Sequence, residues 1–170
     1  MNWQKRRSLV NTSLLMLLAN LLPGPAGAAD LNWLTDLPKA QDQARNEKKL
    51  VLMNFTGSDW CPWCAKLKKE VFNTKEFEEF AAKNLVLLEV DFPRTKKQSD
   101  ELQRANAQLK KKYAEHDGFP TIAVLKSDGK GAWRLVWKQI GCSLPGETKP
   151  LNAKLDPKNW IARMDDARKK

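Results

Sequence analysis

The chain has 170 residues, of which 42% are hydrophobic, and 30 lysines and arginines stand against 20 acidic residues. This length fits one domain with a modest core, and the apolar content excludes a wholly disordered chain. Three cysteines are too few for a disulfide-framework miniprotein, and a single histidine leaves little for a histidine-rich metal centre. The sequence contains no nucleic-acid motif, so no nucleic-acid partner is expected. Attraction of the net charge of +10 to anionic membranes or acidic proteins stays open.

Residues 1–28 have the pattern of a cleaved signal peptide. A basic cluster at residues 5–7 precedes an apolar stretch over residues 14–22, and residues 26–28 are the small residues that signal peptidases cut. The apolar stretch is much shorter than the roughly 20 residues that span a bilayer, so an uncleaved membrane anchor is the weaker alternative. We therefore predict export to the periplasm and a single mature domain over residues 29–170. The removed segment carries three basic and no acidic residues, so the net charge falls from +10 to +7.

The first half of the domain predicts helices that alternate with strands. A helix over residues 38–48 precedes a short apolar strand over residues 50–55, which ends at a Gly-Ser-Asp turn. The pattern is helical again from residue 61 to residue 72. Asn73 with Glu76 resembles a capping box that opens a second helix to Lys83. A strongly apolar strand follows over residues 85–91.

The second half predicts a crossover helix, a hairpin and a last helix. Residues 99–113 favour a helix, and residues 121–126 and 132–140 favour strands joined by an Asp-Gly turn. Asp156 as the N-cap and Pro157 at the first helical position open the last helix. The predicted fold class is therefore α/β, with a central mixed sheet, parallel first and antiparallel at the end, and helices on both faces.

The run Cys61-Pro62-Trp63-Cys64 carries the chemistry. Two cysteines separated by two residues at a helix start can close a small disulfide. Unpaired N–H groups and the positive end of the helix dipole favour the thiolate of Cys61, which we expect to be exposed, whereas Cys64 should be more shielded. Cys61 is then the nucleophile and Cys64 the resolving thiol of thiol-disulfide exchange. Pro62 suits an early helical position because its missing N–H would have no partner there.

The run FTGSDWCPWC over residues 55–64, with Gly-Phe-Pro-Thr at residues 118–121, resembles the thioredoxin-like superfamily, especially exported bacterial thiol-disulfide oxidoreductases. The resemblance covers most of residues 31–170 and implies a thioredoxin fold. It implies that Pro120 is a cis-proline that faces the disulfide, and that the backbone of Phe119 pairs with a bound substrate chain. The residues that it implies for substrate binding and support of the active site are Trp60, Pro62, Trp63, Phe119, Pro120 and Thr121.

The same resemblance implies no cofactor besides the redox-active disulfide Cys61-Cys64. The expected partners are protein thiols and disulfides, together with an upstream electron donor or acceptor, for which a membrane-bound protein is one candidate. The reductase or isomerase direction is expected. The Pro-Trp dipeptide between the cysteines differs from the Gly-Pro of many reducing thioredoxins, however, so the motif does not decide the direction of electron flow.

The proton acceptor of the second cysteine departs from the family pattern. Alignment on Phe55 puts Asn54 where many thioredoxins carry a buried aspartate, and an asparagine cannot act as this base. Asp59 and Glu89 are the candidates for proton transfer. Each also has an ordinary structural interpretation, Asp59 as a turn residue and Glu89 as an edge or paired carboxylate.

Residues 92–97 form a connection that looks longer than in a minimal thioredoxin. It is either a passive extension, which loops tolerate at little cost, or an insertion that selects a partner, and we favour the passive extension. Cys142 admits three interpretations: a buried inert thiol, an intermolecular bridge or a second redox station. We favour the inert thiol.

Two other functions stay open from the sequence. A metal-binding or metal-delivery protein would use Cys61, Cys64 and a third ligand from Cys142 or His116. A thioredoxin-fold binding module would keep the disulfide for structure only.

Overall fold

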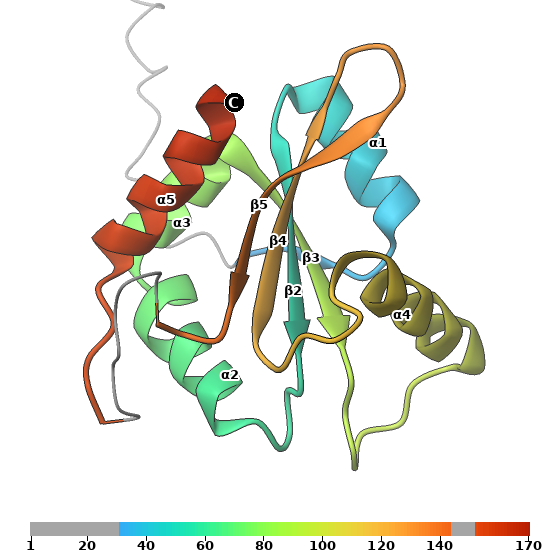
Figure 1. The fold of residues 1–170 in the computed structure, drawn as a ribbon, viewed down its shortest axis with the longest axis vertical. Coiled ribbons are helices and arrows are strands. Elements are labelled where there is room, and N and C mark those ends of the chain that lie inside the picture. The colour runs from blue at the N-terminus through green and yellow to red at the C-terminus, as the bar shows by residue number, and fades with distance from the viewer. Residues whose placement is uncertain (1–30, 144–151) are drawn as a thin grey trace, which may run out of the picture.

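The computed structural model describes residues 31–143 and 152–170 (Figure 1), so the predicted signal peptide, residues 1–28, lies outside the described residues. Five strands form one sheet in the order β1-β3-β2-β4-β5. The first three run parallel, and the last two run antiparallel to their neighbours. They are β1 (Trp33–Leu34), β2 (Leu50–Thr56), β3 (Leu85–Asp91), β4 (Thr121–Ser127) and β5 (Trp133–Ile140). The predicted mixed sheet is confirmed, and among the strands of the described residues only the short strand β1 was not predicted.

Helices cover both faces of this sheet (Figure 1). One face carries α1 (Leu37–Glu47) and α4 (Asp100–Tyr113). The other carries α2 (Pro62–Leu67), the π-helical turn η1 (Lys68–Phe72), α3 (Lys75–Asn84) and α5 (Pro157–Lys169). Within the described residues, no helix has the length and apolarity to cross a membrane.

The central strand β2 is buried along its whole length because both of its faces are covered. Successive side chains of a strand point to opposite faces. Leu50 and Leu52 accordingly join the core under α2, α3 and α5, whereas Val51 and Met53 join the core under α1 and α4. The continuous apolar run of this strand, which ends in the cysteine motif, follows from this double burial.

The helical segment after the cysteines differs from the prediction in two places. Residues 61–72 do not form one α-helix, since α2 gives way to the π-helical turn η1. The N-cap of α3 is Thr74 rather than Asn73, because Thr74 is extended and its Oγ1 accepts the Phe77 N–H at 3.3 Å. Asn73 instead ends η1. Both residue types cap helices well, so the pattern alone placed the cap one residue too early.

The predicted hairpin and last helix are confirmed. Asp128 accepts the backbone N–H groups of Lys130 and Ala132, which closes the turn between β4 and β5. The carboxylate of Asp156 accepts the Lys158 N–H at 2.9 Å and caps α5.

Candidate active site

The cysteine motif lies at the point where β2 leaves the sheet and α2 begins. Cys61 is the N-cap of α2, Pro62 takes the first helical position, and the Cys61 sulfur accepts the Cys64 N–H at 3.1 Å. Cys61 and Cys64 are joined in a disulfide, with 5.2 Å between their Cα atoms. The sulfur of Cys61 therefore lies against an amide that a helix N-terminus leaves unpaired, as the sequence predicts.

Both cysteines are buried in this oxidised form, each with 6% of its surface exposed. The prediction of an exposed Cys61 and a more shielded Cys64 is therefore wrong for the disulfide state. The physical reason is that the disulfide ties the two sulfurs together. Cys61 is also the N-cap of α2, so its sulfur contacts the Cys64 N–H at the helix end and does not point into solvent.

The Phe119–Pro120 peptide bond is cis, as the resemblance implies. Phe55 near the end of β2 pairs with Thr121 at the start of β4, so the proline lies at the same end of the sheet as the cysteines. Two hydrogen bonds shape this segment. Thr121 Oγ1 donates to Gly118 O at 2.8 Å, and Gly141 N donates to Pro120 O at 2.7 Å.

Trp60 is held in place from several sides. Its Nε1–H donates to Phe92 O at 2.8 Å, its ring packs edge-on against Phe119, and the Arg94 guanidinium lies 4.2 Å from the ring centroid. Gly57 leaves room for the ring, since a Cβ built there would lie 2.3 Å from it. Sequence reasoning did not connect Phe92 or Arg94 with the site, because no local pattern signals a contact across about 30 residues.

Trp63 is half-buried against the core, and its backbone carbonyl accepts a hydrogen bond from Cys142. The Cys142 thiol donates to Trp63 O at 3.0 Å, and Cys142 is buried. Burial raises the pKa of this thiol to about 11, so it stays protonated at neutral pH. A protonated, buried thiol is a poor nucleophile, which supports the inert interpretation of Cys142.

Asp59 anchors the connection over residues 92–97. Its carboxylate accepts the hydroxyl of Thr95 at 2.6 Å and the backbone N–H groups of Arg94, Thr95 and Lys96 at 3.0, 2.8 and 3.1 Å. The Thr95 hydroxyl and these amides hold the pKa of Asp59 well below its usual range. A carboxylate so firmly ionised does not take up a proton near neutral pH, so this geometry favours the structural interpretation of Asp59 as a turn residue over proton transfer.

Glu89 lies in a different environment. It pairs in register with Asn54 across β3 and β2. Both residues lie two positions after a leucine of the core under α2, Leu52 or Leu87, so both face the α2 side of the sheet. Burial, followed by the nearby charge of Asp91, raises the pKa of Glu89. The Oδ1 atom of buried Asn54 has no hydrogen-bond partner among the described residues. Of the two candidates, Glu89 is therefore the one whose pKa is raised, which is the direction that suits a general base.

The contacts of His116 and the cysteines give no support to the metal-binding alternative. The His116 side chain is 92% exposed and lies 3.9 Å from Glu115. Cys61 and Cys64 are bonded to each other. Across residues 31–143 and 152–170, no three His, Cys, Asp or Glu side chains are grouped so that they could hold a metal ion.

Comparison with known proteins agrees with this geometry. Residues 37–136 match the family of thioredoxin-like domains. The chain belongs to the thioredoxin-like family. The disulfide bond reductase DsbH of Chlamydia pneumoniae is 35% identical to it over 117 residues, which are 69% of this chain and 69% of that protein. The thioredoxin-related protein DsbJ of the same organism is 27% identical over 103 residues, 61% of this chain but 29% of that protein.

Solved structures show the same thioredoxin-like architecture. A structure of the DsbH oxidoreductase has a TM-score of 0.66 and 26% identity, and the match covers 88% of this chain and 93% of that one. A thioredoxin from Thermus thermophilus has a TM-score of 0.56 at 19% identity, covering 80% and 85% of the two chains, which shows a common fold. Together with the Cys61–Cys64 disulfide, these relatives identify this member of the thioredoxin-like family as a thiol-disulfide oxidoreductase.

Proposed function

We propose that this oxidoreductase works in the cell envelope as a reductase of protein disulfides. The observation that carries the proposal is the Cys61–Cys64 disulfide at the N-terminus of α2, at the same end of the sheet as the cis bond before Pro120. The similarity to a protein named a disulfide bond reductase supports the reducing direction. The signal-peptide pattern of residues 1–28 supports export to the periplasm.

The proposed reaction starts from the reduced protein. The Cys61 thiolate attacks one sulfur of the substrate disulfide, so a Cys61–substrate disulfide forms and the second substrate sulfur leaves as a thiolate and takes up a proton. The Cys64 thiolate then attacks the Cys61 sulfur, and the first substrate sulfur leaves as a thiolate that is also protonated. Two electrons have passed to the substrate, and the Cys61–Cys64 disulfide is restored. An upstream thiol protein returns the two electrons.

The residues around the pair have separate tasks in this proposal. The Cys64 N–H and the start of α2 stabilise the Cys61 thiolate. Glu89 accepts the proton of Cys64 as that thiol becomes the second nucleophile. The substrate chain lies against Trp60, Pro62, Trp63, Phe119, Pro120 and Thr121.

Single-cysteine variants test the function. With a peptide that contains one intramolecular disulfide, the reduced wild-type protein should release two peptide thiols per molecule. Cys61→Ser should abolish this release, and Cys64→Ser should stop at a mixed disulfide that mass spectrometry detects. Cys142→Ala is the matched control and should react at the wild-type rate. Unchanged turnover in Cys61→Ser would contradict the proposal.

The reduction potential tests the direction of electron flow. Equilibration of the Cys61–Cys64 pair with a glutathione series should give a value nearer to about −270 mV, typical of thioredoxin, than to the about −120 mV of a strong oxidant. A value at the oxidising end would overturn the reductase assignment and leave the exchange chemistry intact.

A further inference from the structure

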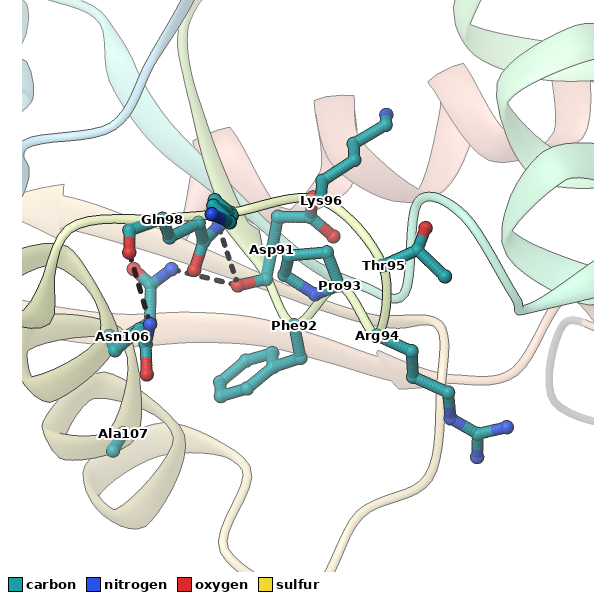
Figure 2. Close-up of a pocket in the computed structure, with 11 residues that line it drawn as sticks. Asp91, Phe92, Pro93, Arg94, Thr95, Lys96, Gln98, Asn106 and Ala107 are labelled. Atoms are coloured by element: carbon teal, nitrogen blue, oxygen red, sulfur yellow. Dashed lines mark hydrogen bonds between the residues drawn. The ribbon is translucent and has the colours of Figure 1, made fainter.

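The connection between β3 and α4 carries a concentration of positive charge. We call residues 92–97 the cationic loop, because three of its six residues, Arg94, Lys96 and Lys97, are basic. All three are exposed, and none forms an ion pair with a carboxylate in the part of the chain that the structure describes. Figure 2 shows the side chains of Arg94 and Lys96 directed away from α4. These charges are therefore available to a partner.

The cationic loop is fastened directly to the active site. Asp59, two residues before Cys61, accepts three of its backbone N–H groups and one hydroxyl. Phe92 accepts the Trp60 indole N–H, and its ring centroid lies 5.4 Å from that of Phe119. The loop thus contacts the residue before the first cysteine and the residue before the cis-proline. These contacts favour a role at the site over a passive extension.

Arg94 brings its charge to the side chain of the residue before the cysteine motif. Its guanidinium lies 4.2 Å from the centroid of the Trp60 ring, a cation–π arrangement that holds the charge over the side chain next to Cys61 in the sequence. The guanidinium donates no hydrogen bond to another described residue, so its N–H groups can bind a carboxylate with two parallel bonds. Lys110 Nζ lies 5.3 Å from the Phe119 ring centroid, but it is half-buried and donates to Ala114 O and Asp117 O, so it adds less to the charge open to a partner.

The nearby carboxylates of Asp59 and Asp91 offset part of this charge, but they number two against three basic residues, and neither pairs with a basic side chain of the loop. Asp59 is occupied by the loop backbone, and Asp91 accepts the Ser58 N–H at 2.8 Å and the Ser58 hydroxyl at 2.6 Å. A pocket of about 510 Å³ lies between the cationic loop and α4 (Figure 2). Arg94, Lys96 and Lys97 line this pocket, and Asp91 is its one acidic lining residue among those that the structure describes.

We propose that the cationic loop selects protein substrates that carry aspartate or glutamate beside the cysteine that Cys61 attacks. This inference rests on the proposed reductase function and states which substrates the reductase would prefer. A carboxylate beside the target cysteine would meet Arg94 next to Trp60 as the substrate chain lies along Phe119. The attraction also draws acidic chains towards the site before contact, since a local excess of one charge raises association rates.

Three disulfide peptides test this selection. They differ only in the two residues that flank the target cysteine, which are both Asp, both Asn or both Lys. Reaction with the reduced protein is followed as second-order kinetics at low salt. We expect the Asp peptide to react about tenfold faster than the Lys peptide, with the Asn peptide between them. The preference should shrink at 0.5 M salt, where screening shortens the reach of the charges.

Two charge-matched variants locate the effect. The first variant combines Arg94→Gln, Lys96→Gln and Lys97→Gln. It should bring the ratio of the Asp-peptide rate to the Lys-peptide rate close to one. Lys48→Gln, Lys83→Gln and Lys130→Gln remove the same charge from exposed positions at the opposite end of the sheet, and should keep the wild-type ratio.

The outcomes separate the inference from the function on which it rests. Equal rates for the Asp and Lys peptides in the wild-type protein would overturn the selection and leave the reductase function standing. An equal loss of preference in both triple variants would also overturn it, because overall charge would then explain the effect. No reaction with any of the three peptides would overturn both proposals.

Discussion

Two carboxylates near the cysteines illustrate how the environment of a single residue decides its role. Asp59 and Glu89 are equal candidates for proton transfer in the sequence. Bonds from Thr95 and the loop amides lower the pKa of Asp59, whereas burial raises the pKa of Glu89. The first carboxylate is therefore held in its charged form, whereas the second is shifted towards its protonated form.

The raised pKa of Glu89 predicts a pH-dependent gain in stability for Glu89→Gln. Below the pKa of about 4.3 in the unfolded chain, the carboxyl is protonated in the folded and the unfolded state, so its burial does not lower the free energy of unfolding. As pH rises through the folded pKa, the half-buried carboxylate must ionise, and the contribution of the protonated form to stability is lost. The free energy of unfolding of the variant, minus that of the wild type, should therefore increase above about pH 4.3 and then level off.

Urea unfolding between pH 3.5 and 8 measures this difference. Glu79→Gln is the control, since Glu79 is exposed and its weak pair with Lys75 spans 3.8 Å. Its difference from the wild type should stay nearly flat across the same range. A flat difference for Glu89→Gln as well would contradict the burial of that carboxylate.

Two glycines beside the active site predict opposite responses to a methyl group. A Cβ at Gly57 would lie 2.3 Å from the Trp60 ring, whereas a Cβ at Gly118 would meet nothing within 4 Å. Gly57→Ala should lower the free energy of unfolding by about 1–3 kcal/mol, as overpacking does, and should displace the indole from Phe92. Gly118→Ala should change it by less than about 1 kcal/mol. Urea titration compares the two, and similar losses would show that the Trp60 ring moves aside freely.

At the scale of the elements, most boundaries follow from the pattern of apolar residues. The strands β2 and β3 are predicted within one residue because helices cover both of their faces, which leaves an uninterrupted apolar run. The π-helical turn η1 could not be predicted in this way. Glu70 on this turn accepts the Leu155 N–H and pairs with Lys66, so its setting depends on a segment about 85 residues away.

The start of α3 gives a prediction at this scale. Thr74→Ala removes the side chain that accepts the Phe77 N–H, and should lower the free energy of unfolding by about 1 kcal/mol. Asn73→Ala should cost less than about 0.5 kcal/mol, because Asn73 is not the cap. Thermal or urea unfolding of both variants checks the assignment. A larger loss for Asn73→Ala would restore the cap position that the sequence pattern favours.

At the scale of the whole molecule, α5 completes the core beneath α2 and α3. Trp160 is fully buried there and packs edge-on against Trp137 of β5. The match to thioredoxin-like domains ends at residue 136, so this helix lies beyond it. The helix nevertheless supplies the largest buried side chain in the described part of the chain.

Trp160→Ala should therefore lower the free energy of unfolding by about 3–5 kcal/mol, the usual cost of removing a large buried aromatic side chain. The exposed residue Arg163 on the same helix provides the control, and Arg163→Ala should stay within about 0.5 kcal/mol of the wild type. Denaturant unfolding measures both. A loss below about 1 kcal/mol for Trp160→Ala would show that α5 adds little to the core.

The sequence by itself determined the order of the main elements and the cysteine pair at a helix start, whereas the cis bond before Pro120 was expected from the family resemblance. The element order and the cysteine pair rest on local patterns: apolar periodicity, turn residues and the spacing of two cysteines within one helical turn. Only the tertiary structure showed the contacts of Asp59, Cys142 and the cationic loop. Asp59 meets Thr95 across 36 residues, and Cys142 meets Trp63 across 79. Such contacts arise when distant segments are packed together, so no stretch of the chain signals them in advance.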